Sequence, residues 1–321
     1  MDETLIARKR SDGKRQSVRE HSENVAGRMA AAKRYPNTSK LLAYLHDLGK
    51  LSEAFQDYIE HGGVRGSVIH AWQGAFLADE LFPDDDLIAK LLKEIVGFCV
   101  TAHHNRLDDG VSPDGRTDYF DKFSNPADAR YFYDAVKGKL AEADKSRLQS
   151  LFADAKPEIG GVLAEIKAVY RTGNSANFAL GLFVKYLFSC LVDADRLDAY
   201  SFETGEEYSA QDADWGALIG VFEDYITGFP ADAEIDRIRK AVSDKCKAAA
   251  RRETGIYQLS VPTGGGKTLS SFRFALHHCR EYHKKRIIYV IPYLSIIEQT
   301  AESLRSSLNL TEADGVIFEH H

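Results

Sequence analysis

Helical periodicity dominates the first two thirds of the chain and limits the folds open to it. Between residues 17 and 200, apolar residues recur three and four positions apart, as in the series Val18, His21 and Val25. The alternation that is typical of strands is scarce there. Hydrophobic residues make up 44% of the 321 residues, enough for such a segment to bury its own core. We therefore expect residues 1–210 to form a mainly α-helical N-terminal domain.

The pattern changes after residue 200. An acidic stretch with Gly and Ser, residues 201–216, suits a surface connection, and a basic helix is expected from Ala231 to Arg252. The remainder alternates apolar runs with amphipathic stretches, an order typical of a parallel α/β sheet. The expected elements are a strand at 255–261, a helix at 269–278, a strand at 286–292, a helix at 295–308 and the start of a third strand at 315–318. Residues 211–250 are thus expected to be a connection with a basic helix, and residues 251–321 part of an α/β lobe.

Residue types that bind metals continue the apolar stripes of the helical segment. They occur in the order His21, His46–Asp47, His70, His103–His104 and Asp195. An imidazole or carboxylate on a core-facing stripe is costly unless it is paired or bound to a cation. Several such groups from different helices can share one cation site, and these donors suit manganese, iron, nickel, cobalt or zinc. Two ions bridged by Asp47 would hold the attacking and leaving oxygens of a phosphodiester displacement.

This ordered series resembles the HD phosphohydrolase superfamily over residues 17–200. The resemblance implies a catalytic site with two divalent transition-metal ions and a bridging, catalytic Asp47. Lys50, in "HDLGK", resembles the family lysine that contacts the scissile phosphate or the nucleophilic water. The implied ligands are His21, His46, Asp47 and Asp195 for the first ion, and Asp47, His70, His103 and His104 for the second. Asp195 lies in a run with Asp193 and Asp198; we favour Asp195, and Asp193 is the alternative.

A second motif, "SVPTGGGKTLSS", follows an expected strand and opens an expected helix, as a phosphate-binding loop requires. Its glycines let backbone N–H groups surround a phosphate, Lys267 would reach the β- and γ-phosphates, and Thr268 would bind magnesium. The strict pattern fails at Val261, where a first glycine would stand. The "PTGGGKT" portion nevertheless resembles the loop of superfamily 2 helicases, and "YVIPYLSIIEQTAESLR" resembles helicase motif Ia. The expected nucleotide-binding residues are Thr263, Gly264, Gly265, Gly266, Lys267 and Thr268.

The two sets of motifs in this order resemble the CRISPR-associated helicase–nuclease of type I interference systems over nearly the whole chain. The resemblance implies degradation of single-stranded DNA, a RecA-like helicase lobe that uses ATP and magnesium for 3′-to-5′ translocation, and recruitment by an RNA-guided surveillance complex (Cascade). No Walker B box, second RecA lobe or arginine finger occurs before His321. We therefore expect residues 251–321 to be an incomplete RecA-like lobe 1 that does not hydrolyse ATP on its own.

Two other functions remain open. The helical domain is also compatible with an HD phosphohydrolase that acts on small nucleotides or cyclic dinucleotides, although helicase-type motifs argue against a signalling hydrolase. A recruitment module that docks on a CRISPR complex without cutting is the alternative without enzyme activity. The intact set of metal-binding residue types argues against it.

Charge and cysteine content limit the partners and the cellular location that we expect for the chain. The formal net charge is −7, from 41 basic and 48 acidic residues, which excludes coating of nucleic acid or of an anionic membrane by bulk charge. Four widely spaced cysteines without a CxxC pair favour reduced thiols and a cytoplasmic location. The longest apolar stretch, Phe178 to Val192, is interrupted by Lys185 and is expected to be too short to span a bilayer, so no membrane partner is expected.

A basic segment precedes the first histidine of the series. "ARKRSDGKRQSVR" carries six basic residues, Arg8, Lys9, Arg10, Lys14, Arg15 and Arg19. Such an arm beside a nuclease site would hold backbone phosphates. A solvated, disordered tail is an equally good interpretation.

Overall fold

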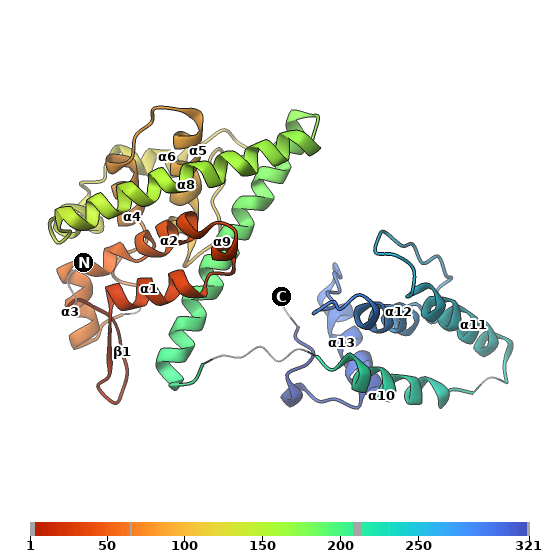
Figure 1. Cartoon of the computed structure of the whole chain (residues 1–321). Coiled ribbons are helices and arrows are strands. Elements are labelled where there is room, and N and C mark those ends of the chain that lie inside the picture. The colour runs from red at the N-terminus through yellow and green to blue at the C-terminus, as the bar shows by residue number, and fades with distance from the viewer. Residues whose placement is uncertain (1–3, 65, 208–212, 231, 320–321) are drawn as a thin grey trace. The chain divides into compact units, whose positions relative to one another are not determined.

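The computed structural model describes residues 4–64, 66–207, 213–230 and 232–319. The chain divides into two compact units, Met1–Tyr208 and Ser209–His321, called unit 1 and unit 2 below. Figure 1 shows that unit 1 is built of helices with one short hairpin. Its elements are β1 (Ile6–Lys9), β2 (Arg15–Ser17), α1 (Val18–Arg28), η1 (Ala30–Lys33), α2 (Pro36–Leu45), η2 (Leu48–Leu51), α3 (Glu53–His61), α4 (Gln73–Leu81), α5 (Leu87–Ala102), α6 (Asp118–Asp121), η3 (Lys122–Ser124), η4 (Ala129–Tyr131), α7 (Tyr133–Gly138), α8 (Glu142–Val169) and α9 (Gly173–Thr204). The expected helical domain is present.

Helix α2 is the central helix of unit 1. It contacts α1, α5, α8 and α9, and Leu41, Leu42 and Leu45 have no exposed surface. A helix that is apolar on most of its faces is buried on most of them. Its first N–H groups are satisfied from α8, where the Glu158 carboxylate accepts the backbone N–H of Thr38 at 2.9 Å. The N-terminus of the helix is therefore anchored by α8, and the helix ends directly before the His46–Asp47 pair.

Helix α9 corrects one expectation. The apolar stretch around Lys185 is not a short segment but part of one continuous helix, Gly173–Thr204. By length and composition alone this helix is sufficient to cross a membrane. Its second half, however, buries Leu187 and Leu191 in the core of unit 1 and carries Asp195. The sequence indicated the apolar stretch but did not reveal that the helix continues on both sides of it.

Strands β1 and β2 form an antiparallel hairpin in the basic segment. Gly13 in the turn has a φ of +89°, a left-handed conformation that glycine adopts without strain. Ile6 and Ala7 of β1 are buried. The segment is therefore an ordered part of the fold, and the interpretation as a disordered tail is wrong.

Unit 2 has its own core. Its elements are α10 (Trp215–Thr227), α11 (Glu234–Ala249), α12 (Lys267–Glu281), α13 (Leu294–Leu308) and η5 (Glu312–Asp314). Helix α10 packs on α12 and α13 through Phe222, Phe272 and Leu304. This helix falls in the stretch that was expected to be mainly a connection. The spacing of Leu218 and Phe222, four positions apart, is nevertheless helical. Of the expected surface connection, residues 208–212 lie outside the described part of the chain, as does Ala231 at the start of the expected basic helix.

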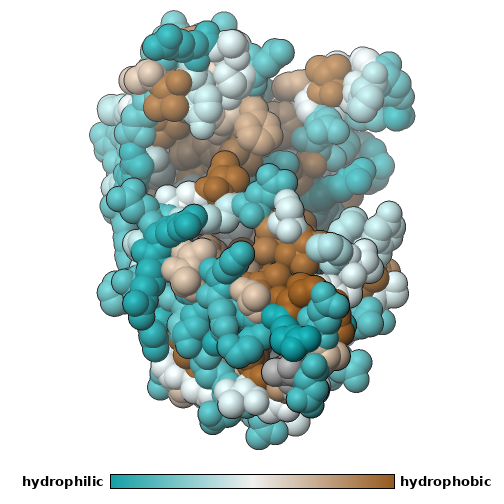
Figure 2. Space-filling view, turned by 90° about the vertical axis from the view of Figure 1, so that its right-hand side faces the viewer, coloured by the Kyte–Doolittle hydropathy of each residue, from teal (hydrophilic) through white to brown (hydrophobic). Residues whose placement is uncertain are grey.

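The expected strands of unit 2 are not present. Residues 255–261, 286–292 and 315–318 carry no strand among the described residues, so a RecA-like sheet is not confirmed. A strand exists only when ladder hydrogen bonds join it to a neighbour, and a parallel strand is buried on both faces. Ile256, Ile288 and Val290 are instead almost fully exposed. Figure 2 shows apolar side chains among polar ones on one face of the molecule. The hydrophobic runs led us to expect buried strands. Whether a run has a neighbouring strand to pair with is not visible in the sequence, and none of the described residues supplies one here.

Candidate metal centre and phosphate loop

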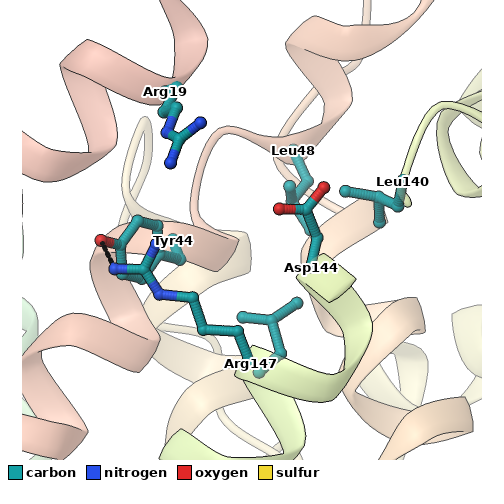
Figure 3. A pocket seen from close by; sticks show the side chains of 7 residues that line it. Arg19, Tyr44, Leu48, Leu140, Asp144 and Arg147 are labelled. Carbon is teal, nitrogen blue, oxygen red and sulfur yellow. Dashed lines mark hydrogen bonds between the residues drawn. The ribbon is translucent and has the colours of Figure 1, made fainter. Parts of the chain in front are cut away.

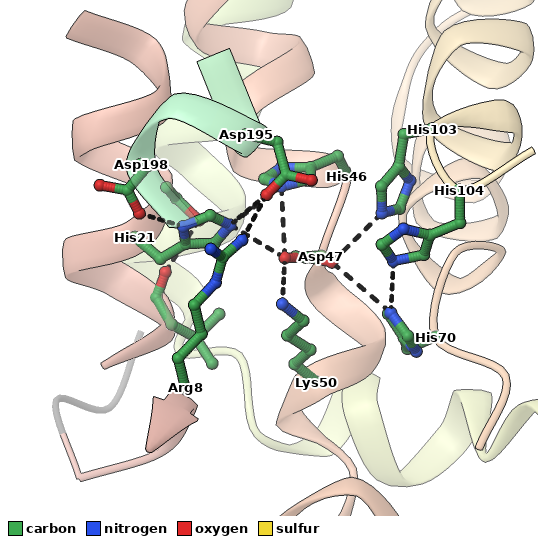
Figure 4. A network of polar contacts seen from close by, with 12 residues as sticks. Arg8, His21, His46, Asp47, Lys50, His70, His103, His104, Asp195 and Asp198 are labelled. Carbon is green, nitrogen blue, oxygen red and sulfur yellow. Dashed lines mark hydrogen bonds and ion pairs between the residues drawn. The ribbon is translucent and has the colours of Figure 1, made fainter. Parts of the chain in front are cut away.

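Unit 1 brings the seven expected metal ligands together from five parts of the chain. They form two groups, and within each the donor atoms lie within 4.8 Å of one another. The groups are His21, His46, Asp47 and Asp195, and Asp47, His70, His103 and His104. Asp47 belongs to both, and Figure 4 shows it between them. The division and the shared aspartate agree with what the family resemblance implies.

The end of α2 explains how adjacent residues face one centre. His46 still has helical dihedral angles, whereas Asp47 has φ −113° and ψ 19° and begins the tight turn η2. Gly49 in that turn allows the segment carrying His70 to approach closely. A Cβ atom at Gly49 would overlap the His70 backbone and the Gln73 side chain. The glycine of "HDLGK" is therefore a packing requirement of the site.

Hydrogen bonds orient the imidazoles. The Nδ1 atoms of His46, His70 and His103 donate to backbone carbonyls, at 2.8, 3.0 and 2.6 Å. His21 Nδ1 lies 2.6 Å from Asp198 Oδ2. Binding a ring at Nδ1 directs Nε2 inward, which is how proteins fix histidine ligands around metals. The four rings are thus arranged with Nε2 facing Asp47.

The atoms at the centre lie close to Asp47. Its Oδ2 is 3.0 Å from His21 Nε2 and 3.2 Å from His46 Nε2, and its Oδ1 is 3.3 Å from His103 Nε2. His70 Nε2 is farther from Oδ1, at 4.0 Å, and lies 2.6 Å from His104 Nε2. Both carboxylate oxygens of Asp47 and His103 Nε2 are buried, and their close contacts among the described residues are the ion pairs of Asp47 with the imidazoles and with Lys50. Carboxylate oxygens and imidazole nitrogens that converge in this way suit divalent transition-metal ions, so the donor set fits such ions.

Burial and mutual charge set the proton affinities. Burial lowers the pKa of His21, but hydrogen bonds with Asp195, Asp198 and Asp47 outweigh it and raise this pKa to about 9. Burial lowers the pKa of His46 and of His70. For Asp195, burial opposes ionisation, yet His21 and His46 hold its pKa well below the usual range. The centre thus contains ionised carboxylates, neutral imidazoles at His46 and His70, and a proton on His21 that a metal ion bound there would displace.

Two cations lie beside the carboxylates. Lys50 Nζ is 2.6 Å from Asp47 Oδ2 and only 6% of the residue is exposed. Arg8 of β1 reaches Asp195, with Nη2 2.5 Å from Oδ1. Lys50 was predicted from the family resemblance to be a catalytic residue. Arg8 was expected only as one member of a basic arm, because no local spacing connects it to Asp195.

The three aspartates of the run on α9 have different surroundings, because Asp193 lies on a different helical face from Asp195 and Asp198. Asp195 is buried and lies 3.3 Å from His21 Nε2, whereas Asp193 is exposed. Asp198, three positions after Asp195 on the same face, contacts the other nitrogen of His21 and accepts a hydrogen bond from Gln16 Nε2 at 2.9 Å. Asp198 thus holds the His21 ring through Nδ1, on the side away from the centre. Spacing of three on one helix is the signal that could have assigned it this place, whereas no signal pointed to Gln16.

The expected phosphate loop lies in unit 2, before α12. Gly264 and Gly266 have φ values of +81° and +80°, which glycine adopts without strain. Helix α12 begins at Lys267, and Lys267 and Thr268 are exposed at its N-terminus together with Thr263 and Gly264. Gly265 is buried, and a Cβ there would overlap Val261. Backbone N–H groups at a helix N-terminus favour an anion, so this turn has the form that binds phosphate.

A small cavity elsewhere in unit 1 is not part of the centre. Figure 3 shows it between Arg19, Tyr44 and Arg147, with Arg147 Nη2 donating to the Tyr44 hydroxyl at 2.7 Å. Its volume of about 20 Å³ is enough for a water molecule and no substrate. None of the seven donor residues lines it.

Comparison with known proteins gives one family match in unit 2 and one similar protein that spans most of the chain. Residues 232–319 match the family described as "Type III restriction enzyme, res subunit". Over 303 residues the chain is 25% identical to the CRISPR-associated nuclease/helicase Cas3 of Haloferax volcanii, a match that covers 80% of this chain. The match covers 31% of the relative's length. The chain is thus similar to a CRISPR-associated helicase/nuclease over most of its own length.

Proposed function

We propose that residues 1–210 are an HD-type nuclease domain that uses divalent metal ions to degrade single-stranded DNA in type I CRISPR interference. The observation that carries this proposal is the pair of four-residue donor groups that share the buried Asp47. Similarity to a protein named as a CRISPR-associated nuclease/helicase supports a nucleic acid as the substrate.

The chain's own residues would hold two transition-metal ions, of manganese, nickel, cobalt, iron or zinc. Bound ions of this kind activate water and polarise a phosphodiester. Asp47 would bridge them, since its Oδ2 faces His21 and His46 and its Oδ1 faces His103. Lys50 is buried beside Oδ2 and would offset negative charge that develops on the phosphate. Because Asp47 and these imidazoles are almost fully buried, such charge interactions are strong.

Unit 2 would contribute nucleotide and partner binding. We propose that residues 251–321 are the first part of a RecA-like helicase lobe, with ATP and magnesium held by Thr263, Gly264, Gly265, Gly266, Lys267 and Thr268. Residues 211–250, which include α10 and the basic helix α11, would lead into that lobe. The match of residues 232–319 to a restriction-enzyme family supports a helicase origin. Cascade is the proposed partner and the cytoplasm the proposed location.

One assay tests the nuclease directly. The chain is incubated with circular single-stranded DNA and manganese, nickel or cobalt, beside an Asp47→Ala variant and an Asp193→Ala variant. We expect the wild type and Asp193→Ala to degrade the circle and Asp47→Ala to leave it intact. No degradation with any of these metals would contradict the proposal. Hydrolysis of guanosine tetraphosphate or cyclic dinucleotides in place of DNA would instead favour a small-nucleotide phosphohydrolase.

A further inference from the structure

The β1–β2 hairpin is fastened next to the metal centre. Gln56 of α3 binds the backbone of Ile6 on both sides: its Oε1 accepts the Ile6 N–H at 2.9 Å, and its Nε2 donates to the Ile6 carbonyl at 2.9 Å. The same Nε2 donates to the carbonyl of Lys50 at 2.7 Å. One side chain therefore ties β1 to the turn that carries Lys50. The position of β1 relative to the centre is fixed by the fold.

The basic side chains of the hairpin form ion pairs with different partners. Lys9 and Arg15 both form ion pairs with Glu60 at the surface, at 2.8 and 2.6 Å. Arg10 pairs with Asp12 in the turn. Within the described residues, Arg8 is the hairpin residue that contacts a donor of the metal centre. The pairing register is irregular between Ile6 and Arg8. Such irregularities redirect side chains and occur next to active sites, which accounts for the direction of Arg8.

Arg8 and a metal ion compete for the same oxygen. Arg8 Nη2 lies 2.5 Å from Asp195 Oδ1, and Oδ1 is also the atom 3.3 Å from His21 Nε2 in the first donor group. Figure 4 shows Arg8 entering beside His21 and Asp195. A cation bound by Asp195 would displace the guanidinium and repel it. Its side chain is 16% exposed, so the displaced group stays at the solvent side of the centre.

We infer that Arg8 is a substrate-phosphate-binding residue of this centre, paired with Asp195 in the metal-free protein and with a phosphodiester oxygen in the metal-loaded protein. This inference rests on the proposed function and assigns one residue to recognition of the DNA backbone. A planar guanidinium with several N–H donors matches two phosphate oxygens at once. The residue would bind any sequence equally, since phosphates carry no base information.

The test compares Arg8→Gln with Lys9→Gln, its neighbour on the same strand whose partner is Glu60 at the surface. Binding of a fluorescein-labelled phosphorothioate oligothymidylate is measured by anisotropy, because its backbone keeps its charges while its hydrolysis is slow. Each protein is measured with manganese and with a chelator, over a range of salt concentrations. Calorimetry of manganese binding is measured in parallel.

With manganese, we expect Arg8→Gln to bind the oligonucleotide about tenfold more weakly than the wild type, with a salt slope lower by about 0.7, the value of one phosphate contact on a single strand. Without metal, the two proteins should bind equally. Lys9→Gln should match the wild type in both states, and Arg8→Lys should retain part of the affinity. Arg8→Gln should bind manganese at least as tightly as the wild type, because a competitor for Asp195 is gone.

Three results would overturn the inference. One is equal oligonucleotide binding by Arg8→Gln and the wild type with manganese. Another is an equal loss with and without metal, which would make Arg8 a general surface contact. The third is weaker manganese binding by Arg8→Gln, which would make Arg8 a structural support. If the wild type degrades circular DNA, any of these outcomes rejects the assignment of Arg8 alone; if it does not, the proposed nuclease itself fails.

Discussion

Asp195 and Asp193 stand two positions apart on α9 and have opposite surroundings. Asp195 is buried beside His21, and Asp193 is exposed. Removing one donor from a first coordination shell leaves the other groups without a full set of ligands. We expect Asp195→Ala to weaken manganese binding more than about 100-fold, the upper end of losses seen for groups that only support ligands. Asp193→Ala should leave the affinity unchanged. Calorimetry measures both, and similar affinities for the two variants would contradict the ligand assignment.

Asp198 acts on the centre through His21. Its carboxylate lies 2.6 Å from His21 Nδ1, and burial, which opposes its ionisation, is outweighed by the bond to His21, so its pKa is lowered. An amide in its place keeps the size but loses the charge that orients the imidazole. We expect Asp198→Asn to reduce manganese affinity about 10- to 100-fold without changing the number of ions bound. Loss of one ion would show instead that Asp198 is itself a ligand.

Close packing of η2 against the segment that carries His70 depends on Gly49. A Cβ atom there would meet backbone, which cannot move aside as a flexible side chain can. We expect Gly49→Ala to lower the free energy of unfolding of unit 1 by about 1–3 kcal/mol and to weaken metal binding. Gly27 in α1 is the matched control, because a Cβ there meets nothing within 4 Å. Gly27→Ala should be neutral or stabilising, by at most about 1 kcal/mol. Urea denaturation monitored by circular dichroism distinguishes the two.

An ion network joins three helices of unit 2. Glu223 of α10 accepts hydrogen bonds from Arg273 and His277 of α12 and from Lys247 of α11. Burial opposes ionisation of Glu223, but Arg273 and the other two donors outweigh it and hold its pKa well below its ordinary value of 4.5. The folded protein therefore binds this proton less readily than the unfolded chain. The stabilisation is present above about pH 4.5 and is lost as the pH falls below it.

Glu223→Gln tests that network. At pH 7 we expect the amides of α10 and α12 to exchange faster in Glu223→Gln than in the wild type, and the difference to shrink below about pH 4.5. The control is Asp224→Asn, at an exposed neighbouring position. Hydrogen-exchange mass spectrometry resolves these helices. A difference that stays constant from pH 7 to pH 4, or widens, would contradict the assigned pKa direction.

Helical elements were predictable from the sequence to a greater extent than the strands. Periodicity between residues 17 and 200, as at Val18, His21 and Val25, indicated the helices of unit 1, because each buries one face in the core. The strand expected at 286–292 depends on pairing with other strands, which an apolar run does not encode. Residue types predicted a shared cation site, and the resemblance to the HD phosphohydrolase superfamily divided its ligands into two groups. The approach of Arg8 to Asp195, 187 positions apart, is a property of the folded chain alone.

Each of the two units of the molecule has a separate hydrophobic core, and the two kinds of motif are divided between them. All seven proposed metal donors lie in unit 1, and the proposed phosphate loop lies in unit 2. The acidic net charge of the chain does not predict the local charge at the metal centre, because two bound dications would reverse the sign of the electric field at Asp47.

Crystals of the chain grown with manganese and measured at the manganese absorption edge would show whether the centre of unit 1 holds two ions at Asp47. We predict two anomalous peaks on either side of Asp47, one within bonding distance of His21, His46 and Asp195, and the other of His70, His103 and His104. Asp47→Ala should lose the bridging arrangement. Absence of anomalous density at both donor groups, or strong peaks only elsewhere on the chain, would contradict the account.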